Sequence, residues 1–137
     1  MINPMATPPR DVAARFLEAY NSAAWGLLDE LVTPDYVHHN GEQALDLAQF
    51  KQGAAWIRSG LPDLTIELED TVSEGDRLAV RFVGRGTHLG SLAGEPPTGR
   101  PVVLHGIFIY RFEGGLIAED WEAMDEQQLL RQISTGS

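Results

Sequence analysis

The residues best suited to chemistry in this sequence are two carboxylates, Asp120 and Glu122, that stand two positions apart. They lie in the segment 116–124, whose residues predict a β-strand. Successive side chains of a strand point to opposite faces, so Asp120 and Glu122 share one face while Glu119 takes the other. Burial and a like charge both disfavour the ionised form of a carboxyl, which suits a general acid or base at neutral pH. The alternative is a solvated strand end with no chemical role.

The histidines are further candidates. His88 ends a predicted strand, where its ring either serves a pocket or fixes the following loop through a hydrogen bond. His105 falls on the outer face of a regular strand and reaches a pocket only if the strand is bulged. His38 and His39 precede an Asn-Gly turn, and alternation sends one inward and the other outward. No third ligand stands at the spacing that a metal site needs, so no metal is expected.

Aromatic side chains could either fill a core or line a substrate pocket, and one side chain can do both. Phe16 and Tyr20 lie four residues apart, as on one face of a helix. Trp56, Phe108 and Tyr110 fall within other predicted elements. The candidate substrate-binding residues are Phe16, His38, Trp56, His105, Phe108 and Tyr110.

The elements that must position these residues follow from hydrophobic periodicity and turn signals. Residues 102–112 and 116–124 form two strands joined by the turn Glu113-Gly114-Gly115. Period-two alternation from Leu64, a turn at 73–76 and a run at 78–87 predict a second hairpin. The irregular segment 88–101 is expected at the pocket rim.

Helices are predicted at both ends of the chain. Thr7 and Pro8 begin the first helix, which ends near Asn21, and Asp46 and Asp125 cap two later helices. The predicted helices span 8–21, 25–32, 46–60 and 126–132, and a short extended piece spans 36–39. Helices followed by strands indicate an α+β fold in which helices cover one face of a curved antiparallel sheet.

Length and composition restrict the possible functions. The 137 residues fit one domain, 8–137, preceded by a loose arm, 1–7. A formal charge of −10 disfavours nucleic acids and anionic membranes as partners. Cysteine is absent, and no run approaches the roughly 20 apolar residues of a membrane span. We therefore expect a cytoplasmic protein.

Four segments resemble the SnoaL-like polyketide cyclases of the nuclear-transport-factor-two-like superfamily. They are TPDYVHHNG (33–41), GTHLGSLAGEPPTGRP (86–101), YRFEGGLIAEDW (110–121) and LLRQ (129–132). The resemblance implies a cone-shaped barrel, with a strongly bent sheet wrapped over the N-terminal helices and an outer sheet face that commonly pairs two copies. It also implies ring closure by intramolecular aldol addition on an apolar polyketide ester, without metal or cofactor.

In the family, an aspartate on the last strand acts as acid/base beside a histidine on the preceding strand. The resemblance places Glu122 at the aspartate and Phe108 at the histidine, so the carboxylate is kept and the histidine is lost. Phe108 cannot donate a hydrogen bond to an enolate, and losing such a donor costs about 2.7–4 kcal/mol. His88, His105 and Tyr20 could replace it, and Tyr20 is favoured because the family places an aromatic residue at the end of the first helix.

Three functions are consistent with these features. The first is a cofactor-independent cyclase with Glu122 as acid/base, assisted by Asp120, Tyr20 and His88. The second is a non-catalytic small-molecule-binding or accessory dimer, suggested by Phe108. The third, an epoxide-opening enzyme, would need two opposed carboxylates. Both faces of residues 102–112 are apolar, so we expect a homodimer that covers the outer one.

Overall fold

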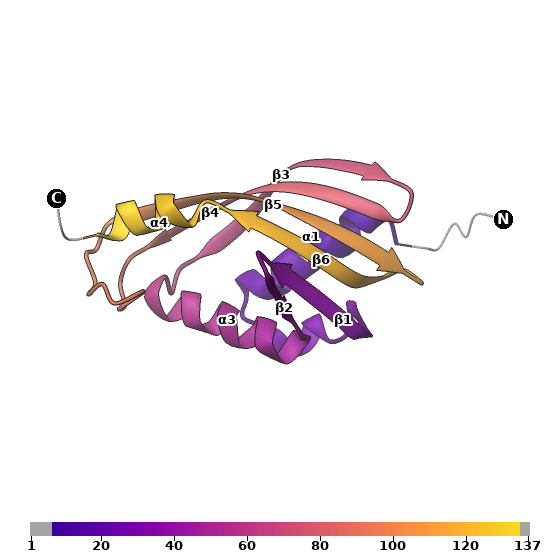
Figure 1. Ribbon diagram of the computed structural model, residues 1–137, viewed down its shortest axis with the longest axis horizontal. Helices are drawn as coiled ribbons and strands as arrows, with labels where there is room; N and C mark the ends of the chain where they lie inside the picture. Colours follow the sequence, from indigo (N-terminus) through magenta and orange to yellow (C-terminus); the bar gives the residue numbers. More distant parts are fainter. Residues whose placement is uncertain (1–6, 135–137) are drawn as a thin grey trace.

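A computed structural model describes residues 7–134 of the chain as one curved sheet with four helices (Figure 1). The sheet has the strand order β2-β1-β6-β5-β4-β3 and is not closed. Its strands are β1 (Val32–Asn40), β2 (Gln43–Leu45), β3 (Thr65–Glu74), β4 (Arg77–Thr87), β5 (Pro101–Glu113) and β6 (Leu116–Met124). The predicted α+β class is confirmed. The expected N-terminal arm, apart from residue 7, lies outside the described residues.

The helices are α1 (Pro9–Asn21), α2 (Trp25–Leu28), α3 (Leu47–Gly60) and α4 (Glu126–Ile133). Asp46 caps α3 by accepting a hydrogen bond from Gln49 N, and Asp125 caps α4 in the same way, as predicted. The expected hydroxyl cap at Thr7 is wrong, because Pro8 is the N-cap of α1 and no side chain caps it. Among residues 7–134, no helix is long and apolar enough to cross a membrane.

The second helix is shorter than the sequence suggested. It ends at Leu28, and Val32, expected as its last residue, begins β1 and pairs with Ile117 of β6. The short extended piece expected at 36–39 is therefore the second half of a nine-residue strand. Tertiary pairing with β6 overrides the helical pattern at this point.

One strand pair departs from the antiparallel arrangement that the sequence indicated. β3, β4, β5 and β6 pair antiparallel in sequence order, as expected for two hairpins. β1, however, runs parallel to β6, which puts His38 opposite Asp120 and Asn40 opposite Glu122. This pairing joins the N-terminal half of the chain to the strand that carries the candidate carboxylates.

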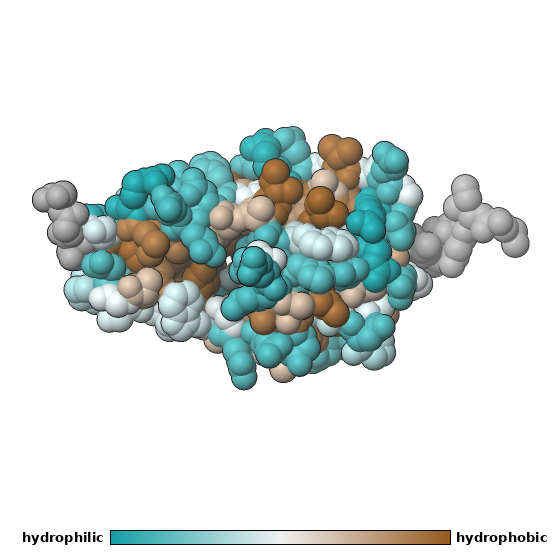
Figure 2. Space-filling view, in the orientation of Figure 1, coloured by the Kyte–Doolittle hydropathy of each residue, from teal (hydrophilic) through white to brown (hydrophobic). Residues whose placement is uncertain are grey.

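The two faces of β5 differ in exposure. On the inner face Leu104, Phe108 and Tyr110 are buried in the core against α1, whereas on the outer face Ile107 is 48% and Ile109 39% exposed. The sheet thus has a filled concave side and an outer side that keeps exposed apolar residues. Figure 2 shows such brown residues among teal ones above β6.

Candidate active site

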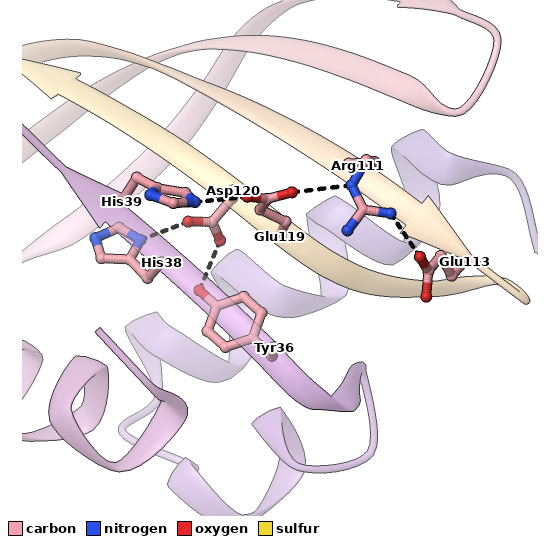
Figure 3. A network of polar contacts seen from close by, with 7 residues as sticks. All are labelled: Tyr36, His38, His39, Arg111, Glu113, Glu119 and Asp120. Carbon is pink, nitrogen blue, oxygen red and sulfur yellow. Dashed lines mark hydrogen bonds and ion pairs between the residues drawn. The ribbon is translucent and has the colours of Figure 1, made fainter. Parts of the chain in front are cut away.

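Asp120 lies at the centre of a buried hydrogen-bonded cluster between β1 and β6 (Figure 3). His38 Nδ1 is 2.5 Å from Asp120 Oδ1, and the Tyr36 hydroxyl donates to Asp120 Oδ2 at 2.6 Å. Tyr36 and His38 reach the same carboxylate because residues two apart on a strand share a face. All three side chains are buried, with 1–3% of each residue exposed.

His38 also bridges Asp120 to the second carboxylate. Its Nε2 lies 3.2 Å from Glu122 Oε1, and the Glu122 side chain is 18% exposed. Phe50 of α3 packs edge-on against the imidazole, with ring centroids 4.9 Å apart. Each ring nitrogen therefore faces a carboxylate, and the ring is fixed between the sheet and α3.

The two carboxylates determine the charge of His38. Burial lowers the pKa of the imidazole, but hydrogen bonds to Asp120 and Glu122 and their negative charges outweigh it and raise the pKa to about 9. Burial raises the pKa of Asp120, while the hydrogen bond and positive charge of His38 oppose the rise. At neutral pH the shared proton therefore resides on His38, as an imidazolium between two carboxylates.

A cavity of about 500 Å³ opens beside this cluster, under α3 and α4. Most lining residues are apolar or aromatic, with few polar groups among them, as in small-molecule sites. The polar lining residues include His38, Asn40, Gln43, Glu122 and Glu126. The aromatic lining residues include Phe16, Tyr20, Phe50, Trp56, Phe82 and Phe108. In Figure 2, brown apolar side chains gather between α4 and α3.

Tyr20, at the end of α1, lines the cavity close to Glu122. Burial, and then the negative charge of Glu122, raise the pKa of its hydroxyl to about 12, against the opposing charge of Arg58. The Arg58 guanidinium lies over the Tyr20 ring and donates to its backbone oxygen, which holds the residue in place. Tyr20 is therefore a neutral hydrogen-bond donor over the whole physiological pH range.

The structure brings six of the sequence candidates to this cavity: Phe16, Tyr20, His38, Trp56, Phe108 and Glu122. Asp120 lies directly behind His38. Trp56 is 55% exposed, so it stands at the mouth and does not fill the core. Phe108 lies opposite Glu122 in the β5–β6 pairing and stacks on Phe82, so it contributes an apolar wall.

Three candidates lie elsewhere. His88 is fully buried, but its Nδ1 bonds to the Thr98 hydroxyl and backbone N–H, so it fixes the following loop. His105 is exposed on the outer face, because β5 runs through this position without a bulge. Tyr110 is fully buried in the core beneath Phe16 and Phe108 and is not among the lining residues. None of these three residues lines the cavity, and His88 and His105 take the loop-fixing and outward positions that the sequence left open for them.

A second histidine–carboxylate pair lies on the opposite side of the same two strands (Figure 3). His39 Nε2 is 2.6 Å from Glu119 Oε2, and Arg111 links Glu119 to Glu113. The His39 ring also stacks on Trp121. As predicted, one of the two histidines points inward and the other outward: His38 faces the core, and His39 lies with Glu119 on the outer face.

Sequence reasoning missed the connection of Tyr36 and His38 to the carboxylates. The alternation Tyr36, His38, Asn40 could have identified one inward face of a strand. Nothing local indicates that this strand runs beside β6. In the part of the chain that the structure describes, no three histidine, cysteine or acidic side chains are grouped so as to hold a metal ion.

Comparisons with known proteins identify the family and the fold of the chain. The model of the SnoaL-like polyketide cyclase family matches residues 10–133. Nogalonic acid methyl ester cyclase of Streptomyces nogalater is 28% identical over 126 residues, which cover 85% of this chain and 90% of that protein. IdmH of Streptomyces antibioticus, a candidate polyketide cyclase, is 33% identical, with a TM-score of 0.84 over 92% of this chain and 98% of its own.

A SnoaL-like protein of Jannaschia sp. CCS1 has a TM-score of 0.86 over 100% of this chain and 99% of its own. At 22% identity, this likeness concerns the fold alone.

Proposed function

Because the chain belongs to the SnoaL-like polyketide cyclase family, we propose that it closes a ring in an apolar polyketide-like substrate by intramolecular aldol addition. The observation that carries this proposal is the bridge Asp120–His38–Glu122, whose last carboxylate reaches the wall of an apolar cavity. Homologues named polyketide cyclases support an enzyme over a non-catalytic binding protein.

Glu122 is the general base in this mechanism. The imidazole of His38 lies against Oε1 and holds the side chain at the cavity wall, where Glu122 can take a proton from a carbon beside a substrate carbonyl. Asp120 accepts from the other ring nitrogen and orients the imidazole. In the family, the corresponding histidine is expected on the strand before the last, which is β5 here. In this mechanism His38 takes its role from β1.

Tyr20 stabilises the enolate that forms. Its hydroxyl lines the same cavity and stays protonated, so it can donate to the enolate oxygen. The enolate carbon then attacks a second carbonyl of the same molecule, forming the new carbon–carbon bond. The resulting alkoxide takes back the proton from Glu122, so no atom is gained or lost and the catalytic groups return to their starting state.

The lining charges select a neutral substrate. None of the described residues that line the cavity is a lysine or arginine, whereas Glu122 and Glu126 both line it. A free carboxylate would be repelled by these groups, and the cationic ring of His38 is already held between Asp120 and Glu122. We propose that the substrate enters as an ester or another uncharged derivative, in accord with the methyl ester in the name of the Streptomyces nogalater relative.

The test is Glu122→Gln, assayed by turnover of a linear polyketide methyl ester. Glutamine keeps the shape of the side chain but cannot take the proton, so kcat should fall by roughly 10²–10⁴-fold while the substrate still binds. Glu119→Gln is the matched control, because Glu119 neighbours the site on the same strand but points to the other face. Equal turnover by Glu122→Gln and the unmodified protein would refute the mechanism.

We also propose that two copies pair through the outer sheet face. His39, Trp121, Ile109, Ala79 and Val72 pair in register across five strands and form a stripe on that face. Val72 is 71% and Ile109 39% exposed. Basic and acidic side chains, Arg81 with Asp70 and Arg111 with Glu119, flank the stripe, so a second copy related by a two-fold axis offers opposite charges.

A further inference from the structure

The cluster behind the cavity contains two buried phenols that differ in one respect. The Tyr36 hydroxyl donates to Asp120 Oδ2 at 2.6 Å. The hydroxyl of Tyr110, opposite Asp120 in the β5–β6 pairing, is equally buried and has no hydrogen-bond partner among the described residues. The two tyrosines are therefore alike in side chain and in burial, and they differ in whether the hydroxyl bonds to Asp120.

The bond from Tyr36 reaches the oxygen of Asp120 that His38 does not use. Asp120 Oδ1 faces His38 Nδ1, and Oδ2 faces Tyr36. A carboxylate held at both oxygens cannot rotate without losing one bond, and a donor to it favours its ionised form. The direction of the Nδ1 bond in turn decides whether Nε2 points at Glu122.

Few other polar groups face this cluster. β6 contributes Glu122, β5 contributes the neutral Tyr110, and α1 contributes the neutral Tyr20. From α3 the contact with the His38 ring is made by Phe50, which carries no charge. Among the described residues, the neutral side chain that donates to Asp120 is therefore Tyr36, whereas the Tyr110 hydroxyl has no hydrogen-bond partner.

We propose that Tyr36 is a positioning residue of this active site: its hydroxyl holds Asp120 ionised and aligned on His38, and thereby aims the imidazole at Glu122. Tyr36 is not among the residues that line the cavity, so it acts through Asp120 and His38. The inference rests on the proposed function for its catalytic consequence. Its structural part concerns proton positions that can be measured without any substrate.

The experiment compares Tyr36→Phe with Tyr110→Phe in the full chain. Titration of the Asp120 carboxyl by ¹³C NMR and of the His38 ring by ¹⁵N NMR gives both protonation steps directly. Without its donor, Asp120 should take up a proton at a pH about one unit higher, a roughly tenfold change, in Tyr36→Phe. Tyr110→Phe removes a hydroxyl that bonds to nothing described and should leave the Asp120 titration in place.

The catalytic readout is the pH dependence of turnover. In Tyr36→Phe the acid limb of kcat should move to higher pH by the same amount, with KM unchanged, since the cavity wall is intact. An unshifted titration in Tyr36→Phe, or an equal shift in both variants, would overturn the inference. If no polyketide is turned over by the unmodified protein, the proposed function fails while the NMR result still decides the role of Tyr36.

A measurement on the unmodified protein covers the case in which Tyr36→Phe does not fold. The Tyr36 hydroxyl proton should give a downfield, slowly exchanging ¹H resonance with a nuclear Overhauser effect to the His38 ring, because both bond to the two oxygens of one buried carboxylate. A phenol proton of Tyr36 that exchanges with solvent at once would contradict the proposal.

Discussion

A single imidazole, His38, connects the two carboxylates of the proposed site. Asp120 lies on one ring nitrogen and Glu122 on the other, so the charge of the ring depends on both carboxylates. The resemblance to the family predicts a histidine opposite Glu122, and Phe108 stands at that position. We propose that His38 supplies this ring to Glu122 from β1, the other strand beside β6, and so compensates for the phenylalanine.

The charge of His38 also makes folding stability depend on pH. Its pKa is about 9 in the folded chain and about 6.5 when unfolded, so the stabilisation is fully present below pH 6.5 and is lost as pH rises through 9. The loss should reach about 3 kcal/mol in the free energy of unfolding, measured by urea denaturation between pH 6 and 10. His38→Gln should lack most of this slope; an equal slope in both proteins would contradict the charge assignment.

In the proposed mechanism Tyr20 supplies the donor to the enolate, and this role can be tested alone. Tyr20→Phe keeps the ring that packs on Trp25 and Phe50 but removes the hydroxyl. We expect kcat to fall by roughly 10²–10³-fold with KM little changed, because the lost hydrogen bond forms with the developing charge. Steady-state kinetics on the ester substrate measures both constants, and a change confined to KM would mean that Tyr20 only binds the ground state.

At the scale of elements, the parallel pairing of β1 with β6 creates the site. It aligns Tyr36 and His38 with Asp120, and Asn40 with Glu122, on the concave side of the sheet. β5 completes the wall from the other side of β6, where Phe108 stacks on Phe82. The strand that carries the carboxylates is therefore flanked by one polar neighbour and one apolar neighbour.

The packing of β5 can be tested with two glycines. A Cβ at Gly106 would collide with the Phe82 ring and with the backbone oxygen of Ala123, whereas at Gly53, inside α3, no atom lies within 4 Å. Gly106→Ala should destabilise the protein by about 1–3 kcal/mol by displacing the Phe82–Phe108 stack. Gly53→Ala should stabilise it by about 0.5–1 kcal/mol, because alanine favours a helix.

Thermal unfolding of these two variants gives the sign of each change. Equal melting temperatures would show that Phe82 can move aside at no cost. A lower melting temperature for Gly53→Ala would show that α3 packs more closely at that position than the structure indicates.

At the scale of the whole molecule, the outer sheet face predicts association. Light scattering of the purified chain should give the mass of a dimer, about twice 15.0 kDa. Ile109→Glu places a charge in the middle of the apolar stripe and should shift the protein to monomers. Leu27→Glu is the matched control, because Leu27 is an exposed leucine on α2, away from the stripe, and should leave the dimer intact.

A monomer at all concentrations would refute the dimer, and so would a dimer that survives Ile109→Glu. Since the chain carries a net charge of −10, the measurement belongs at physiological salt, where repulsion between copies is screened.

The sequence by itself determined the α+β class, both hairpins, the caps of α3 and α4, and the common face of Asp120 and Glu122. These features depend on local rules: period-two alternation, glycine in turns and side-chain caps at helix starts. The resemblance to the family supplied the chemistry. Local patterns did not predict the start of β1, because the hydrophobic pattern at 25–32 is that of a helix. They also contain no information about the partner of β1, which lies more than 80 residues away in the sequence.

The tertiary structure alone decided which side chains meet. It put His38 and Tyr36 on Asp120, turned His88 to its own loop and His105 to the outer face, and buried Tyr110 beneath the cavity. Contacts between residues far apart in sequence depend on the register and direction of strand pairing. These are fixed by the packing of the whole sheet over α1 and α3, and no short stretch of sequence records them.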